Sequence, residues 1–236
     1  MGTPPTPLTV HPHRLSTDLF LLLFSSSAEQ NCTGSLSRLC RGFVMAYVAV
    51  VGSRSITGLV PAQVRSVVSA LTARGYGIGS GGALGADQCA LVSLLSLASP
   101  AVLVQSRLCL AWVCSTSLPA SVRGSVVRFT AHGGQVIPGW AGPGAPYRLV
   151  VAALQARSAL LVGHQHCRAV VAFFGPGRCR GTSYTVLQAL SRHRPVFAVG
   201  GLPPRLPAGV RSVAGKLGGV AGVWLLAVGY RPDFGG

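Results

Sequence analysis

The sequence predicts an α/β protein with a Rossmann-like parallel sheet and helices on both faces. Short continuous apolar runs alternate with amphipathic segments of helical length, which is the pattern of β-α-β units. Several of the apolar runs end in Gly-rich turns, as strands that lead into a ligand site do. Hydrophobic residues make up 49% of the 236 residues and charged residues only 10%, so the chain can bury a large core.

The first half of the chain contains the clearest elements. Residues 47–51 form a continuous apolar run before a glycine, which is typical of a parallel strand buried on both faces. Residues 61–74 predict a helix, because Pro stands in the first turn, apolar residues recur at helical spacing and Gly75 follows. The next elements are a strand over residues 76–79, a helix over residues 86–97 and an apolar run over residues 101–104.

The second half is harder to assign between residues 105 and 146. Residues 126–129 fit a strand, and the Gly- and Pro-rich residues 138–146 fit a loop. Beyond them the alternation returns. It predicts a helix over residues 147–161, a strand over 169–174, a helix over 182–191, a strand over 195–199 and a last strand or helix covering the sheet over 220–228.

The charge balance is strongly basic. Twenty Lys and Arg residues stand against four Asp and Glu residues, which gives a formal net charge of +16. Few of these side chains can pair with an internal carboxylate, so they predict an anionic partner, a nucleic acid or a nucleotide ahead of an acidic lipid surface. The codon bias of a GC-rich genome would explain why Arg replaces Lys, but it does not explain the shortage of Asp and Glu.

We divide the chain into a poorly ordered extension, residues 1–44, and one domain, residues 45–236. The extension shows no hydrophobic periodicity, and Met45 opens directly onto the first strand, so Met45 is a candidate for the true start. The seven cysteines form no regular framework, which favours a reduced, cytoplasmic setting. The apolar run over residues 19–24 is too short to cross a bilayer, and we expect no membrane segment.

A first candidate phosphate-binding turn follows the first predicted strand. Gly52 allows a sharp turn, and Ser53 with the following amides would face an anion at the carboxyl edge of the sheet, where open α/β folds bind ligands. Arg54 would contact a phosphate directly. Because Gly-Ser after a strand is also a common turn, this motif alone has little specificity.

A second Gly-rich turn lies between the second predicted strand and helix. Its glycines permit close backbone approach, and the free amides of a helix start favour a phosphate. Asp87 is the only carboxylate side chain between Met45 and Asp233. It fits either a helix cap in the first turn or a partner for a ribose hydroxyl. The candidate residues are Ser80, Gly81, Gly82, Ala83, Gly85 and Asp87.

A third turn of the same kind follows the predicted strand over residues 169–174. Arg178 and Arg180 flank it, Gly181 follows, and Thr182 would cap the next helix while its hydroxyl reaches an anion. Because the carboxyl ends of parallel strands meet at one edge of a sheet, we expect the second and third turns to converge on one cleft.

These motifs together resemble the SLOG superfamily. That group joins the DNA-processing protein A (DprA/Smf) family with YpsA-like proteins and the cytokinin-activating LOG phosphoribohydrolases. The resemblance implies a Rossmann-like fold that binds nucleotides or, in the DprA branch, single-stranded DNA during uptake and recombination. It spans about residues 47–199, and it is carried by residues 50–54, 80–87 and 180–182, with Arg157 and Ser158 before the strand over 169–174.

Carried over by position, the resemblance implies a phosphate pocket with no catalytic residue. The LOG motif Pro-Gly-Gly-x-Gly-Thr-x-x-Glu ends in a catalytic Glu, but Thr185 stands at that position here and no nearby carboxylate replaces it. The N-terminal helical domain and C-terminal winged helix of many DprA proteins are not apparent. The residues implied to line the pocket are Gly52, Ser53, Arg54, Ser80, Gly81, Gly82, Gly85 and Asp87, with Arg180, Gly181 and Thr182 closing it.

We expect neither a metal nor a cofactor. His164, His166 and Cys167 resemble a metal cluster, but no second pair lies at zinc-finger spacing, which favours a solvated helix end. A Ser/His/Asp triad cannot be assembled either. The three tryptophans, Trp112, Trp140 and Trp224, are scattered, which favours core packing over base stacking.

The sequence leaves two classes of function. The first is a non-enzymatic DprA-like protein that binds single-stranded DNA or a nucleotide in DNA processing, with a homodimer left open. The second is a sensor or enzyme for a small nucleotide such as an ADP-ribose derivative, which Asp87 on a ribose would favour. A degenerate paralogue with neither activity is a third alternative.

Overall fold

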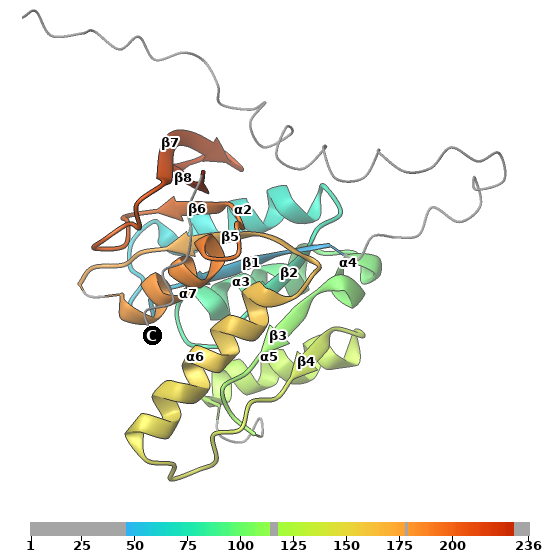
Figure 1. Ribbon diagram of the computed structural model, residues 1–236. Helices are drawn as coiled ribbons and strands as arrows, with labels where there is room; N and C mark the ends of the chain where they lie inside the picture. The colour runs from blue at the N-terminus through green and yellow to red at the C-terminus, as the bar shows by residue number, and fades with distance from the viewer. Residues whose placement is uncertain (1–45, 114–117, 178, 229–236) are drawn as a thin grey trace, which may run out of the picture. The chain divides into compact units, whose positions relative to one another are not determined.

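The centre of the protein is a mixed eight-stranded sheet in the order β4-β3-β2-β1-β5-β6-β8-β7 (Figure 1). The computed structural model describes residues 46–113, 118–177 and 179–228, all within one compact unit over residues 34–236. Neighbouring strands from β4 through β6 pair in parallel, whereas β8 pairs antiparallel with both β6 and β7. The strands are β1 Tyr47–Gly52, β2 Gly77–Ser80, β3 Arg107–Cys109, β4 Gln135–Ile137, β5 Cys167–Phe173, β6 Val196–Val199, β7 Val210–Leu217 and β8 Val220–Ala227.

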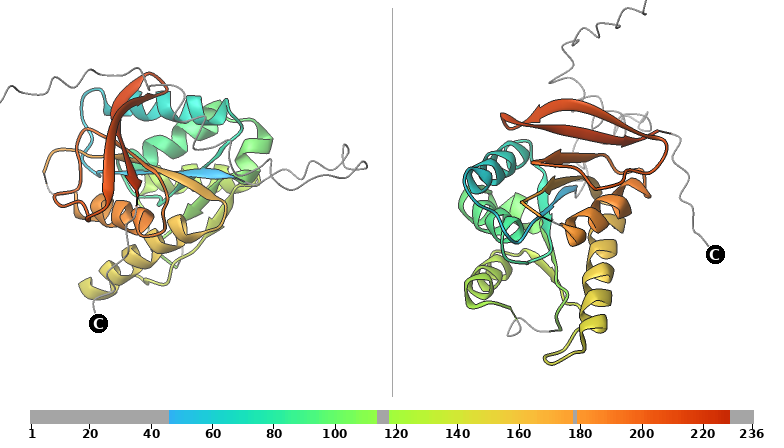
Figure 2. Two further views of the ribbon diagram at one scale, coloured as in Figure 1. Left: turned by 45° about the horizontal axis from the view of Figure 1, so that its top comes forward. Right: turned by 90° about the vertical axis from the view of Figure 1, so that its left-hand side faces the viewer.

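Helices cover both faces of this sheet, as the sequence predicts. Figure 2 shows α2, α3 and α5 on one face and α6 with α7 on the other. Strand β1 lies between β2 and β5, and its residues from Tyr47 to Val51 are all buried. The helices are α2 Val60–Thr72, α3 Ala86–Leu97, α4 Pro100–Gln105, α5 Ala120–Ala131, α6 Tyr147–Gly163 and α7 Arg180–Leu190.

The first half of the chain follows the predicted pattern closely. Helix α3 spans the predicted residues, and α2 differs from its prediction by one residue at its start and two at its end. The apolar stripe of α2 is fully buried, and Gly75 follows the helix with φ +80°, a conformation that glycine adopts without strain. The stripe consists of Val64, Val67, Val68 and Leu71.

The region between residues 101 and 137 departs from the prediction. The strand expected over residues 126–129 is wrong, because these residues lie in α5. Val122, Val126 and Phe129 are buried at helical spacing, so one face of a helix accounts for their apolar character. The apolar run over residues 101–104 lies in α4, and the strands on either side of α5, β3 and β4, have only three residues each.

Residues 220–228 were expected to form a last strand or helix that covers the sheet. They contain strand β8, which instead extends the sheet by pairing with β6. Strands β7 and β8 form a hairpin whose turn residues, Gly218 and Gly219, have φ values of +58° and +79°. Positive φ at both positions is what a two-residue type I′ turn requires. The ring of Trp224 on β8 lies 4.9 Å from that of Phe197 on β6, which joins the hairpin to the parallel strands.

The three tryptophans do not share one environment. Trp224 is 2% exposed, as core packing requires. Trp140 is 49% exposed, so the expectation of core packing is wrong for it. Trp112 is half-buried and forms a bridge with Ala141.

The predicted extension, residues 1–44, and the Met45 start lie outside the described residues, so the division into an extension and a domain stays a prediction. None of the described helices combines the length and the apolar character needed to span a bilayer.

Replacing Phe197 tests how firmly the hairpin is held. Phe197 is fully buried against Trp224, so Phe197→Ala should lower the free energy of unfolding by about 3–5 kcal/mol, measured by urea denaturation. The control Val127→Ala removes a side chain that is 60% exposed and should change this quantity by about 0.5 kcal/mol or less. Equal effects of the two substitutions would contradict the packing described.

Candidate phosphate-binding cleft

A cleft with a volume of 610 Å³ opens at the carboxyl edge of the sheet, beside β1 and β5. From β1 the chain builds outward to β4, whereas β5 and β6 lie on the other side of β1, so the strand order reverses here. Open α/β sheets bind ligands in the crevice that such a reversal creates. Of the predicted site residues, Gly52, Ser53, Arg54, Ala83, Asp87, Arg157, Arg180, Gly181 and Thr182 line this cleft.

The Gly-rich turn between β2 and α3 lies mostly behind the cleft wall. Ser80, Gly81, Gly82 and Gly85 do not line the cleft. A Cβ on Gly81 would come within 2.6 Å of Arg157 Cζ, so the missing side chain leaves room for this guanidinium group. The carbonyl of Gly81 accepts a hydrogen bond from Arg157 Nη1 at 3.2 Å. These residues therefore pack the turn against its neighbours, and only Ala83 and Asp87 reach the cleft from it.

Gly85 makes the contact between this turn and the one after β1. It has φ +83°, and a Cβ there would lie 2.3 Å from the carbonyl oxygen of Ser53. The same carbonyl accepts the backbone N–H of Ala86 at 3.1 Å. Glycine is therefore required both by the backbone angle and by the close approach of the two turns.

Asp87 is buried, 2% exposed, and holds three segments together. Its Oδ1 accepts the backbone N–H of Gly52 at 3.2 Å, and its Oδ2 accepts that of Ala83 at 3.4 Å. Arg157 Nη1 from α6 lies 4.0 Å from Oδ2. Of the two alternatives for Asp87, a hydrogen-bonded helix cap is therefore not formed: Asp87 lies in the first turn of α3, but its oxygens bond amides of two turns outside the helix.

Burial raises the pKa of Asp87, because removal from water disfavours the charged carboxylate. The Arg157 guanidinium and the backbone amides of Ala83, Gly52 and Gly81 oppose this effect. The hydrogen bonds from Ala83 and Gly52 and the ion pair are all long, 3.2 to 4.0 Å, so they only partly offset the loss of hydration.

The turn after β1 presents Arg54 rather than a free serine hydroxyl. Ser53 Oγ accepts the backbone N–H of Ser55 at 3.1 Å and lies 3.2 Å from its carbonyl oxygen, so the hydroxyl closes its own turn. Arg54 is exposed at the cleft. Gly175 lies in the loop after β5, and a Cβ there would lie 2.6 Å from Ser53 Oγ. This glycine therefore allows the loop after β5 to approach the turn after β1 closely.

Helix α7 begins at the cleft wall. It starts at Arg180, two residues before the predicted start, so Thr182 lies inside the first turn and the expectation that it caps the helix is wrong. The N-cap residue is Cys179, and no side chain caps this end. An uncapped helix start offers backbone N–H groups and a partial positive charge to an anion. Arg178, predicted to flank this turn, lies outside the described residues.

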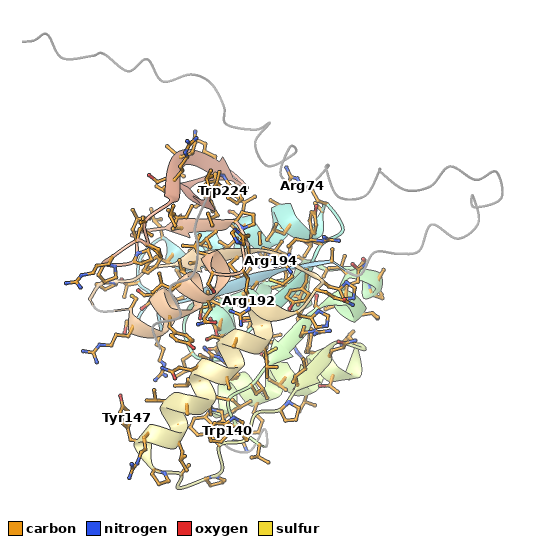
Figure 3. The ribbon with its side chains drawn as sticks, viewed as in Figure 1. Arg74, Trp140, Tyr147, Arg192, Arg194 and Trp224 are labelled. Carbon is orange, nitrogen blue, oxygen red and sulfur yellow. The ribbon has the colours of Figure 1, made fainter. Side chains whose placement is uncertain are left out.

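Two tyrosines at the cleft were not predicted as site residues. Tyr147 begins α6 and is 81% exposed although it lines the cleft, and Figure 3 shows it at the outer end of that helix. Tyr184 lines the cleft from α7 and is half-buried. Gln155 and Ser158 of α6 were missed as lining residues as well. A helix start after a Gly/Pro-rich loop was the only sequence signal for Tyr147.

Thr185, which stands where the LOG enzymes have their Glu, joins α7 to α6. Its Oγ1 lies 2.9 Å from Ser158 Oγ and 3.1 Å from the carbonyl oxygen of Gly181. Ser158 in turn donates to the carbonyl of Leu154 at 3.1 Å. Among the residues that line the cleft, Asp87 is the one carboxylate, and its oxygens are already engaged with the protein.

Residues 32–117 match the family model described as DNA recombination-mediator protein A. A solved structure of DNA processing protein A from Helicobacter pylori, reported for its single-stranded DNA binding mode, is similar with a TM-score of 0.50 and 18% identity over 69% of each chain. DNA processing protein A from Streptococcus pneumoniae has a TM-score of 0.48 and 21% identity over 67% of this chain and 52% of its own. A comparison with curated proteins returns no match.

The family match covers only part of the cleft. It contains the turns after β1 and β2, with Gly52 and Asp87, but ends before α6 and α7. Residues 32–117 therefore resemble the DNA recombination-mediator protein A family, and the solved structure from Helicobacter pylori shows the same kind of fold.

The raised pKa of Asp87 predicts the pH dependence of stability. Between the ordinary value of 3.8 and the raised value, the folded protein holds a proton that the unfolded chain has released, so the free energy of unfolding falls as pH rises through this window. Asp87→Asn removes this titration. The wild-type minus Asp87→Asn difference, measured by urea denaturation across the acid range, should therefore decrease with pH. An increase would show that Arg157 and the amides outweigh burial.

Proposed function

We propose that this chain, which resembles the DNA recombination-mediator protein A family over residues 32–117, binds the phosphate groups of single-stranded nucleic acid in the cleft at the carboxyl edge of its sheet. One observation carries the proposal. Arg54, Arg157 and Arg180 line a single cleft together with the uncapped start of α7. Guanidinium groups and helix N-termini are the standard protein partners of phosphate oxygens.

The charge of the cleft supports an anionic ligand. Arg157 has Asp87 4.0 Å away, whereas no ion pair of Arg54 or Arg180 with a described carboxylate is present. Both side chains are exposed, so a ligand can reach them without rearranging the core. Contacts of this kind bind phosphates without reading bases, and binding should therefore depend strongly on salt and weakly on sequence.

The exposed tyrosine gives the cleft a surface for bases. Tyr147 lines the cleft with its side chain 81% exposed, so its ring is accessible to a ligand. Single-stranded nucleic acids stack their bases on such rings while basic residues follow the backbone. We infer that Tyr147 stacks on a base next to the phosphates held by Arg54 and Arg180.

A small nucleotide is the second candidate ligand, because a cleft of 610 Å³ lies within the range of small-molecule sites, about 300–1,000 Å³. Its recognition through Asp87 on a ribose is disfavoured because this carboxylate is only 2% exposed and already accepts the amides of Gly52 and Ala83. We therefore favour the nucleic acid.

Neutralising the exposed arginines tests the nucleic-acid proposal. Arg54→Ala with Arg180→Ala removes two charges at the cleft, so affinity for a poly-dT oligonucleotide should fall, and the slope of log affinity against log salt should become shallower by about 0.7 for each phosphate that the protein no longer neutralises. Fluorescence anisotropy across a salt series measures both. The control Arg205→Ala with Arg211→Ala removes two exposed charges outside the cleft and should leave the slope nearly unchanged.

The outcome also separates the two ligands. If oligonucleotide affinity changes little between low and physiological salt while ADP-ribose raises the melting temperature, the small-nucleotide candidate replaces the nucleic acid.

Changing Tyr147 tests the stacking contact. Tyr147→Ala should weaken binding of the oligonucleotide by about 1–3 kcal/mol, whereas Tyr147→Phe, which keeps the ring, should retain most of the affinity. Because the side chain is 81% exposed, neither change should alter the melting temperature of the free protein appreciably. Equal losses for Ala and Phe would assign the effect to the hydroxyl and contradict stacking.

A further inference from the structure

A second group of basic side chains lies at the opposite, amino edge of the sheet. Arg107 is the first residue of β3, His166 directly precedes β5, and Arg194 precedes β6 by two residues. His164 follows the end of α6, and Arg192 follows the end of α7. We call these five residues, Arg107, His164, His166, Arg192 and Arg194, the amino-edge cluster.

The buried ring of Tyr47, the first residue of β1, links the members of this cluster. Arg107 Cζ lies 5.5 Å from the centre of that ring, and the His164 ring centre lies 6.0 Å from it. The ring centres of His164 and His166 are 5.0 Å apart. Arg194 is close enough to lower the pKa of both Tyr47 and Cys167 by its charge, against the larger effect of burial.

Arg192 and Arg194 complete the cluster from the end of α7. A Cβ on Gly163, the residue before His164, would lie 3.3 Å from Arg192 Nε. Figure 3 places Arg192 and Arg194 away from Tyr147, which lies at the other end of α6 beside the cleft. The cluster and the cleft are therefore separate places on the molecule, one at each edge of the parallel strands.

No carboxylate among the described residues neutralises this cluster. Asp87 is the only acidic residue that the structure describes, and it lies at the cleft. The Nε atoms of Arg107 and Arg194 are buried without a hydrogen-bond partner. Cationic groups that are half-buried with incomplete hydrogen bonding are unfavourable unless an anion accompanies them.

The partial negative charge at the C-terminal end of α6 balances only part of the positive charge of the cluster. A helix C-terminus attracts cations through a partial charge of about half an elementary charge. The Tyr47 hydroxyl already donates to the carbonyl of Leu161 in the last turn of α6, and Arg192 bonds the carbonyl of Gln188 at the end of α7. Arg107 bonds Gln135 Oε1 at 2.8 Å, which is a neutral partner. A positive excess remains.

We propose that the amino-edge cluster is a second phosphate-binding site, separate from the cleft, whose affinity for phosphate is controlled by the protonation of His164. Its ligand is a phosphate group, either a diester of the nucleic acid or free phosphate. With a site at each edge of the sheet, one nucleic-acid strand could contact both sites, or two nucleic-acid strands could bind to one protein molecule. The existence of this site does not depend on the proposed function of the cleft.

The surroundings of His164 explain the expected pH dependence. Burial first, then the charges of Arg107 and His166, lower the pKa of His164, so its imidazole is neutral near neutral pH in the free protein. Tyr47 faces it from β1 and Arg107 from β3, and Arg192 at the end of α7 lies near Gly163, the residue before it. A bound phosphate would supply the missing negative charge and favour the imidazolium. By linkage, phosphate should bind more tightly as pH falls.

The experiment uses the full chain with the cleft disabled by Arg54→Ala and Arg180→Ala. Oligonucleotide binding by this protein should persist and should strengthen about fivefold or more between about pH 8 and about pH 5.5. Adding Arg107→Gln and Arg194→Gln should abolish this remaining binding. The matched pair Arg205→Gln and Arg211→Gln removes the same charge from exposed positions and should change the affinity by about threefold or less.

Imidazole NMR signals of the unmutated chain give a second measurement that needs no cluster variant. Inorganic phosphate or poly-dT should shift the His164 and His166 signals and raise the pKa of His164. Shifts with both ligands support a site that accepts nucleic-acid phosphates, and shifts with inorganic phosphate alone support one for free phosphate. If neither ligand shifts these signals, or if the matched pair loses as much affinity as the cluster pair, the proposal is overturned. Persistence of full affinity after the cleft substitutions would refute the cleft and leave this site standing.

Discussion

The buried carboxylate of Asp87 is the constraint on which the cleft depends. It accepts hydrogen bonds from the turns after β1 and β2, and it lies opposite Arg157 of α6. These segments come from distant parts of the chain, and each contributes to one wall of the cleft. Because a buried charge is stable only with fixed partners, the carboxylate sets the positions of the amides and the guanidinium together.

Because Asp87 is engaged by these partners, most of the arginines lack a carboxylate that would neutralise them. The described residues contain no second carboxylate that could neutralise the arginines, so positive charge accumulates where helices and strands end. At the carboxyl edge this positive charge lies in the cleft, around Arg54 and Arg180. At the amino edge it lies in the amino-edge cluster, around Arg107 and Arg194. Both edges of the sheet therefore favour anions, but only the carboxyl edge adds an uncapped helix start and an exposed tyrosine.

The predictions held where hydrophobic periodicity was long and failed where it was short. Helix α2 shows four apolar positions at helical spacing, and β1 is a continuous apolar run, so both followed from the sequence. Strands β3 and β4 have three residues each, too few for any period to show, and the apolar residues of α5 around Val126 were mistaken for a strand. The site showed the same limit. Gly-rich turns located the cleft, but Tyr147 carried no motif.

By itself, the sequence determined the fold class, the carboxyl edge as the place of the candidate site and the basic character of the protein, because these depend on local pattern and composition. Only the tertiary structure decided which turn residues face the cleft. It placed Ser80, Gly81, Gly82 and Gly85 behind the wall and directed Asp87 to the amides of Gly52 and Ala83. It also joined Arg107, His164 and Arg194 at the other edge. Contacts between residues far apart in the chain depend on strand order, which no local pattern encodes.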